Sequence, residues 1–431
     1  MRAGLFVLFS LFLCAGSAAA DESGSLSLQQ AVELAVKNSP EVLSAEQEVK
    51  LARLHVRDAR LQFAPQITLS GTAARFNLDH PVITGGELSD RILTPVSDTN
   101  DTKEQVFTAR IQALQTLYAG GRDLNNLKLA KVAYNRAQAD YRAVRSSKAL
   151  EAKKAYFSLQ YRRRLLEAAE KTLSEMRALT EGKKISASER IDALLQISAL
   201  EGKKGEIALQ EETSVSELLR LISRDPLFSL KLDDDFDVAS VPETLYKCIV
   251  TATEYRAELR NEIYQAQMDD IAVNMAIIRH YPTITLGAFY DLSADEFSDL
   301  SHNSTYGHNW MAMLSVRLPI SLGSWSLVSQ RRIQQRQGEL KRVEIQDSIR
   351  SEITAAYREA DFWDKEGQRL EKELENAEKL YSEISISSDG TAAKVRSAAF
   401  LFQMKSMFLK AVYNQRGARA RLEWARGLDF K

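Results

Sequence analysis

The residues of this chain that could do chemistry are few and scattered. Of the five histidines, only His302 and His308 share a short segment, where they could begin a metal site. A metal site needs further ligands at an orderly spacing, and neither cysteines nor regularly spaced carboxylates accompany this pair. We interpret the segment as a solvated loop, and we expect no metal site and no cofactor.

Phosphate chemistry and catalysis are equally poorly supported. The run Arg162-Arg163-Arg164 could bind phosphate, but on a long helix it is more often a solvated face. The chain has 57 basic and 58 acidic residues, so no net charge favours nucleic acid. It contains no glycine-rich phosphate loop, nucleophile elbow or paired-histidine helix. We expect no catalytic residue, no enzymatic activity and no nucleic-acid partner.

The first twenty residues predict export. A basic residue precedes an apolar run that reaches Cys14, and Ala18-Ala19-Ala20 offers small residues for cleavage before Asp21. This is typical of a signal peptide over residues 1–20, rather than a retained anchor or a lipidated Cys14. The mature chain then keeps one cysteine, Cys248, so packing and not an internal disulfide must hold its fold.

The rest of the chain reads as two copies of one unit. Pro65–Leu69 recurs as Pro282–Leu286, and Ala155-Tyr156 recurs further along as Ala356-Tyr357. Ordered recurrence of different motifs indicates duplication. We therefore predict one repeat over 21–223, a connector over 224–242 and a second repeat over 243–431.

The sequence pattern predicts the same five elements in each repeat. A first helix covers 28–62 or 243–280, and a strand then opens at Pro65 or Pro282. Ile67 and Leu69 alternate there with polar residues, which indicates a sheet with one apolar face. Polar loops over 79–103 and 293–308 lead to second strands over 105–118 and 309–320.

Glycines then end the strands, and long helices begin. Gly120 and Gly121 stand before a helix over 122–181, and Gly323 before one over 326–385. Sixty helical residues reach roughly 90 Å, a length that suits a coiled coil. Apolar residues at heptad spacing, as in Leu127–Val144 and Ile349–Trp363, support it. Return helices over 187–222 and 391–427 follow tight turns.

The strands raise a closure problem. Four strands with one apolar face cannot form a closed barrel, and an open edge in lipid leaves backbone groups unsatisfied. If the strands enter a membrane, several chains must share one barrel. The expected fold class is therefore mixed α+β and mainly α, with long antiparallel helical hairpins and four strands per chain in a shared barrel.

The order of these elements resembles TolC-like outer-membrane efflux proteins. The resemblance is carried by Pro65, Pro282, the strand exit Leu117–Arg122 and the helix opening Ala31–Glu41 with its counterpart ending Arg256–Leu259. It implies a homotrimer with a twelve-stranded barrel in outer-membrane lipid and a twelve-helix periplasmic tunnel. It also implies a periplasmic adaptor protein and an inner-membrane pump of the RND or ABC type, in a Gram-negative-type cell.

The resemblance further implies a periplasmic gate and adaptor contact at the two helix turns. Lys183 and Lys184 depart from the family's small apolar pair, and the matching acid is either Glu189 or Asp192. Tyr381 reads either as a contact of the closed state or as a heptad core aromatic. The candidate gate residues are Gly182, Lys183, Lys184, Ile185, Ser186, Ser188, Tyr381, Ser388, Asp389, Gly390, Thr391, Lys394 and Arg396.

Two questions stay open at this point. The cargo implied by the resemblance is a small molecule (a drug or a metal) or a secreted polypeptide. The alternative from a different class is a periplasmic coiled-coil scaffold or adaptor protein, whose strands would form a small soluble sheet without a transmembrane barrel.

Overall fold

A computed structural model describes most of the chain. The signal peptide expected over 1–20, the loop expected over 79–103 and most of the connector expected over 224–242 lie outside the described part. So do six of the candidate gate residues, which are Gly182, Lys183, Lys184, Ile185, Ser388 and Asp389. The described residues are 25–75, 105–181, 186–225, 228, 230–233, 244–294, 296–297, 308–320, 323–386 and 390–428.

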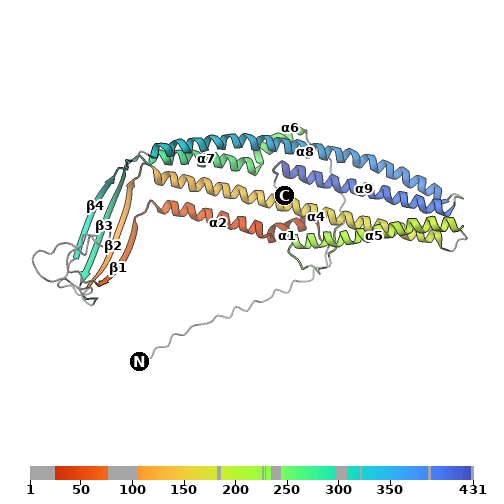
Figure 1. Cartoon of the computed structure of the whole chain (residues 1–431), viewed down its shortest axis with the longest axis horizontal. Coiled ribbons are helices and arrows are strands. Elements are labelled where there is room, and N and C mark those ends of the chain that lie inside the picture. Colours follow the sequence, from red (N-terminus) through yellow and green to blue (C-terminus); the bar gives the residue numbers. More distant parts are fainter. Residues whose placement is uncertain are drawn as a thin grey trace, which may run out of the picture.

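The molecule is long, with four strands at one end and helices along the rest of its length (Figure 1). The longest elements are α4, with 59 residues, and α8, with 63, so α8 alone reaches about 95 Å. In chain order the elements are α1 (Leu28–Asn38), α2 (Pro40–Leu61), β1 (Gln66–Arg75), β2 (Gln105–Tyr118), α4 (Arg122–Thr180), α5 (Ala187–Leu221), α6 (Leu245–Tyr255), α7 (Ala257–Ile278), β3 (Thr283–Ala294), β4 (His308–Arg317), α8 (Ser324–Ile386) and α9 (Thr391–Ala425).

Neighbouring helices repeat the order of the strands. The sheet runs β1-β2-β3-β4, and every neighbouring pair is antiparallel. Next to the sheet, α2, α4, α7 and α8 pack in that same sequence, and each is joined directly to its own strand (Figure 1). Towards the far end, α5 and α9 take the places of α2 and α7 beside the two long helices.

Both first helices are broken, which corrects the expectation of continuous helices over 28–62 and 243–280. The chain is extended at Ser39, with ψ 122°, because a proline at position 40 disfavours the helical conformation of the residue before it. Arg256 has almost the same extended conformation, with ψ 127°, although no proline follows. At this second break Arg256 is buried and forms ion pairs with Glu258 and Glu352.

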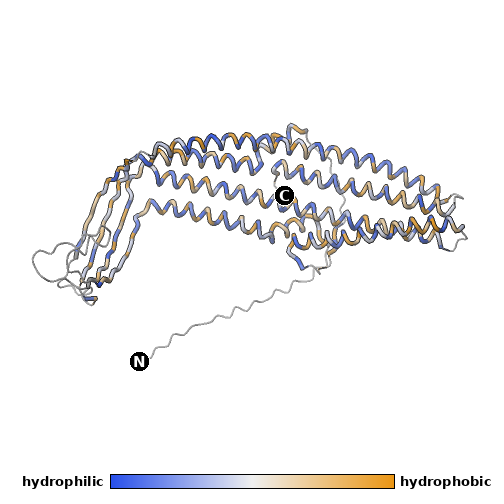
Figure 2. The backbone as a smooth tube through the Cα atoms, in the orientation of Figure 1, coloured by the Kyte–Doolittle hydropathy of each residue, from blue (hydrophilic) through white to orange (hydrophobic). Residues whose placement is uncertain are grey.

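Small side chains let the helices pack closely. The seam expected on the second long helix is buried at Ile349, Ile353, Ala356 and Ala360, as predicted, against α6 and α9. The seam expected over Leu127–Val144 is only half-buried in the single chain. In Figure 2 hydrophobic and hydrophilic residues mix along every helix. Within the described residues, no helix combines the length and apolarity needed to cross a membrane.

Candidate functional site

One face of the sheet is apolar and exposed. The register places Ile67 and Leu69 of β1 on the same face as Trp310 and Leu314 of β4. These four side chains are between 63% and 79% exposed. A soluble protein rarely leaves so many large apolar side chains on one continuous surface. We call this surface the apolar face; its other large members are Phe107, Ile111, Ile284, Leu286, Tyr290 and Val316.

The opposite face carries most of the polar side chains of the sheet, together with a few apolar ones such as Met311 and Met313. Arg110 of β2 and Asp291 of β3 are register partners there, and Arg110 Nε lies 2.7 Å from Asp291 Oδ1. The Asp291 residue is only 4% exposed. The Arg110 guanidinium also lies 4.8 Å from the centre of the Phe289 ring on the same face. The ion pair is thus sheltered on this face, while the largest apolar side chains of the other face are exposed, the reverse of a soluble sheet.

The predicted strand–helix junctions lie together between the sheet and the helices. Pro65 and Pro282 directly precede β1 and β3, and Gly323 directly precedes α8. Gly120 has φ +62°, and a Cβ there would lie 2.6 Å from the Cβ of Tyr281. Only glycine fits both this conformation and this contact with the other repeat.

A capping box fixes the start of α5. Ser186 Oγ accepts a hydrogen bond from the Glu189 amide at 3.3 Å, and the Glu189 carboxylate accepts one from the Ser186 amide at 3.1 Å. Ser188 Oγ lies 3.1 Å from Ser186 Oγ. At the other hairpin, a Cβ on Gly390 would lie 2.7 Å from Glu189 Oε1. The two helix starts are therefore in close contact.

Of the two acids weighed for the first turn, Glu189 is used by the cap and Asp192 faces the other hairpin. Arg396 Nη2 of α9 lies 2.9 Å from Asp192 Oδ2 of α5. Lys394 donates a 2.8 Å hydrogen bond to the Ser385 carbonyl near the end of α8. The structure thus brings Arg396 to a partner across the hairpins and Lys394 to its own hairpin.

An apolar cluster lies beneath these contacts. Ala193 of α5, Val395 of α9 and Met176 of α4 are among its most buried members. Thr391 is also buried, and Tyr381 packs partly buried against the cluster. Burial, and then the nearby charge of Glu175, raise the pKa of the Tyr381 hydroxyl above its usual range. The aromatic ring therefore contributes to the packing between the two hairpins.

Sequence reasoning missed the ion pair on the polar face. Arg110 is the only charged residue of β2, and Asp291 is the only one of β3. A lone charge in an otherwise uncharged strand could have been noticed on each side. Their pairing could not, because it depends on how strands of different repeats align.

Comparison with known proteins agrees with this geometry. Residues 31–186 match the family "Outer membrane efflux protein". No curated relative matches the sequence. Among solved structures the fold is similar to CusC, with TM-score 0.76, 16% identity, and coverage of 93% of this chain and 92% of that one. The outer membrane channel MtrE of Neisseria gonorrhoeae, in an open state, gives TM-score 0.76, 17% identity and coverages of 93% and 88%.

A further similar structure is the outer membrane protein VceC of Vibrio cholerae, with TM-score 0.76, 15% identity, and coverage of 94% of this chain and 97% of that one. At identities this low, the similarity of the structures establishes the fold. The resemblance to TolC-like outer-membrane efflux proteins is thereby confirmed, as is a mainly α fold with a four-stranded β contribution. The matched family consists of channel proteins, not enzymes.

Proposed function

We propose that this protein is the outer-membrane channel of an export system, in which three copies close one barrel and one tunnel. The observation that carries the proposal is the reversed burial of the sheet. The apolar face is exposed to the surroundings, while the polar face shelters the ion pair between Arg110 and Asp291. Lipid outside and water inside would satisfy both faces of such a sheet.

The edges of the chain support closure by further copies. β1 and β4 end the sheet, and each has one neighbour in the described chain. The outer helices also expose large apolar side chains, such as Leu51 on α2 and Leu340 on α8. Copies related by a rotation that closes on itself would pair β4 with β1 and α8 with α2 and α5. Three copies, the number implied by the family resemblance, would supply twelve strands.

The length of the helices supports a large periplasmic portion. The strands fit a lipid layer, and α8 would carry the tunnel on the order of 95 Å away from it. The hairpin tips then lie farthest from the outer membrane. We assign the periplasmic gate and the contact with an adaptor protein to these tips, and the energy for export to an inner-membrane pump of the RND or ABC type.

A polar lumen is compatible with several classes of cargo. No chemistry on the cargo is needed, since a channel contributes a path and a constriction. Small molecules, including drugs or metals, and a secreted polypeptide are all compatible with this design. The neighbouring genes of a pump and an adaptor would narrow the choice.

Fractionation of a cell that expresses the full chain tests the proposal. We expect the protein in the outer-membrane fraction, as an oligomer that migrates as three copies on a detergent gel unless the sample is boiled. Recovery as a soluble periplasmic monomer would contradict the proposal and favour the coiled-coil scaffold or adaptor instead.

A further inference from the structure

A cavity of about 390 Å³ lies halfway along the helical part, where α7 begins and α9 ends beside α4. Its wall on α4 includes Arg142 and Ser146, two positions one turn apart. The start of α7 contributes Arg260, and the end of α9 contributes Trp424. This volume is within the range of sites that hold small molecules.

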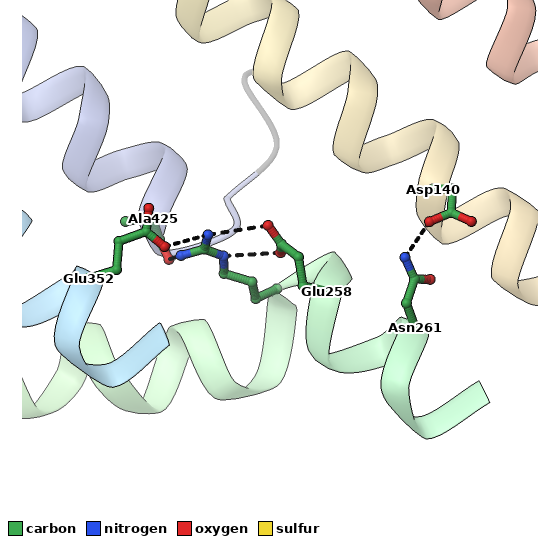
Figure 3. Close-up of polar contacts among 6 residues, drawn as sticks. Asp140, Glu258, Asn261, Glu352 and Ala425 are labelled. Carbon is green, nitrogen blue, oxygen red and sulfur yellow. Dashed lines mark hydrogen bonds and ion pairs between the residues drawn. The ribbon is translucent and has the colours of Figure 1, made fainter. Parts of the chain in front are cut away.

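One wall of the cavity is held rigidly by Arg256, which is 5% exposed. Its guanidinium lies 3.0 Å from a Glu258 carboxylate oxygen and 2.7 Å from one of Glu352. It also donates to the carbonyl of Ala425 at 3.3 Å and lies 4.6 Å from the Trp424 ring centre. Figure 3 shows Glu258, Glu352 and Ala425 converging on this one group.

The charges of this wall are already matched. Burial acts to lower the pKa of Arg256, but the hydrogen bond and charge of Glu258, with the charge of Glu352, outweigh it and raise the pKa. Both Glu258 oxygens contact Arg256, at 3.0 and 3.2 Å. On the next turn, Asn261 hydrogen-bonds to Asp140 and ties α7 to α4 (Figure 3). Glu258, Glu352 and Asp140 are thus each paired with another group of the protein.

Two further arginines of the cavity have no acidic partner among the residues that the structure describes. Arg142 and Arg260 form no ion pair within the described part of the chain, and Arg260 only donates a long hydrogen bond, 3.4 Å, to the Glu254 carbonyl. Arginine matches oxyanions with a planar fork of N–H donors. Two guanidinium groups without ion pairs among the described residues could therefore bind the oxygen atoms of a negatively charged ligand at this cavity.

The corresponding joint of the first repeat is packed with apolar side chains. There α2 begins near the end of α5, and Asn38 donates a 3.0 Å hydrogen bond to the Ile222 carbonyl. Leu218, Leu219 and Ile222 fill this joint with at most 1% exposure. The second repeat has an apolar core at its joint as well, around Cys248, Ala252 and Leu422, and the charged cavity lies beside it.

Gly427 lets the end of α9 pack directly against the backbone at the start of α7, beside the cavity. Its φ is +70°, and a Cβ there would lie 2.9 Å from the Arg256 amide nitrogen and the Tyr255 carbonyl carbon. Trp424 and Ala139 add apolar surface to the lining. The cavity therefore combines unmatched positive charge with an aromatic and aliphatic floor.

Further copies of the chain would not cover this cavity. It lies between α4 and α7, and these two helices have α2 and α8 of the same chain on their outer sides. Copies that add at α2, α5 and α8 approach from those outer sides. The cavity persists in the proposed ring.

We propose that this cavity binds a small organic anion, with a carboxylate or phosphate held by Arg142 and Arg260 and an aromatic or apolar part against Trp424. The ligand class follows from the lining: two arginine forks for oxygen atoms, and the apolar surface of Trp424 and Ala139 for the remainder. The inference is independent of the export function, because the cavity lies within one chain.

Calorimetric titration of the purified full-length protein in detergent tests the proposal, with benzoate and phenyl phosphate as anionic probes. We expect both to bind, and the double variant Arg142→Ala/Arg260→Ala to bind at least tenfold more weakly. The control variant Lys131→Ala/Arg145→Ala removes two α4 charges outside the cavity and is expected to keep the affinity. Circular dichroism and gel mobility check that both variants are folded and assembled.

Three outcomes would overturn the proposal. The first is that neither probe binds at millimolar concentration. The second is that the cavity variant and the control variant lose affinity equally, since the charge of α4 as a whole would then explain binding. The third is that benzyl alcohol binds as tightly as benzoate, or inorganic phosphate as tightly as phenyl phosphate, since one half of the lining would then contribute nothing.

Discussion

Arg396 and Asp192 form an ion pair of 2.9 Å that joins α9 to α5 close to the tips of the two hairpins. The two residues come from different repeats, so their contact reports directly whether the hairpin tips are together. Both side chains are about half exposed, and such a pair contributes only about 0.2–1 kcal/mol to stability. Its effect should therefore appear in the conformation of the tips and not in the overall fold.

Charge reversal at this pair should open the tips. Arg396→Asp places a second acid beside Asp192, and we expect higher single-channel conductance in planar bilayers. Asp192→Arg should do the same by placing two arginines together. The double swap Asp192→Arg/Arg396→Asp rebuilds the pair and should restore the original conductance. Equal conductance for the single variants and the original protein would refute a role of this pair in closure.

The two faces of the sheet should respond in opposite ways to one substitution. Leu314→Arg puts a charge on the apolar face, at a cost of roughly 2–4 kcal/mol near the middle of a bilayer. Ser315→Arg is the matched control, since the next residue of the strand points to the polar face. We expect Leu314→Arg to reduce the assembled protein in outer-membrane fractions and Ser315→Arg to leave it unchanged. Equal losses would argue against lipid at the apolar face.

The ion pair between Arg110 and Asp291 should be sensitive to removal of one partner. Asp291→Ala leaves Arg110 without its ion-pair partner in a sheltered position, at an expected cost of about 3 kcal/mol. Replacing both, as in Arg110→Met/Asp291→Leu, removes the charge together with its partner and should cost less. The temperature at which the oligomer dissociates on a detergent gel measures both. A double variant less stable than Asp291→Ala would contradict this expectation.

The break before α7 should accept proline. Ala257 is the first residue of α7 and follows a residue that is already extended, as Pro40 does in the first repeat. We expect Ala257→Pro to leave stability unchanged or to raise it by about 0.4–1 kcal/mol, because proline restricts the unfolded chain. Arg256→Ala should cost about 3 kcal/mol or more, since Glu258 and Glu352 lose their shared partner. Chemical denaturation of the two variants compares them; a strongly destabilised Ala257→Pro would contradict this account of the break.

Alkaline pH should weaken the packing between hairpins through Tyr161. Burial raises the pKa of its hydroxyl above the ordinary 10.0, although the charge of Arg162 opposes the shift. The folded protein therefore holds this proton more tightly than the unfolded chain, and stability falls as pH rises from about 10 through the folded pKa. Between pH 9 and 11, we expect the melting temperature of Tyr161→Phe to fall less than that of the original protein. An identical pH dependence would contradict the prediction.

The sequence predicted the elements well where local patterns decide them. Strand β2 was expected over 105–118, as observed, because alternation and the glycines after it mark both ends. The cap of α5 at Ser186 likewise involves only neighbouring residues, since Glu189 is three positions away. The break at Arg256 escaped prediction because no proline follows, and because its partner Glu352 lies far along the chain on α8. The partner of Arg396 required knowing that the two hairpin tips meet.

The matching order of strands and helices has a consequence for stoichiometry. Each of α2, α4, α7 and α8 continues directly from or into its own strand, without any crossing of connections. Any ring that closes at the strand edges must therefore close at the helix edges with the same number of copies. The curvature of the strand ring and that of the helix ring would therefore have to agree on one copy number. Each chain would specify this number at both of its edges.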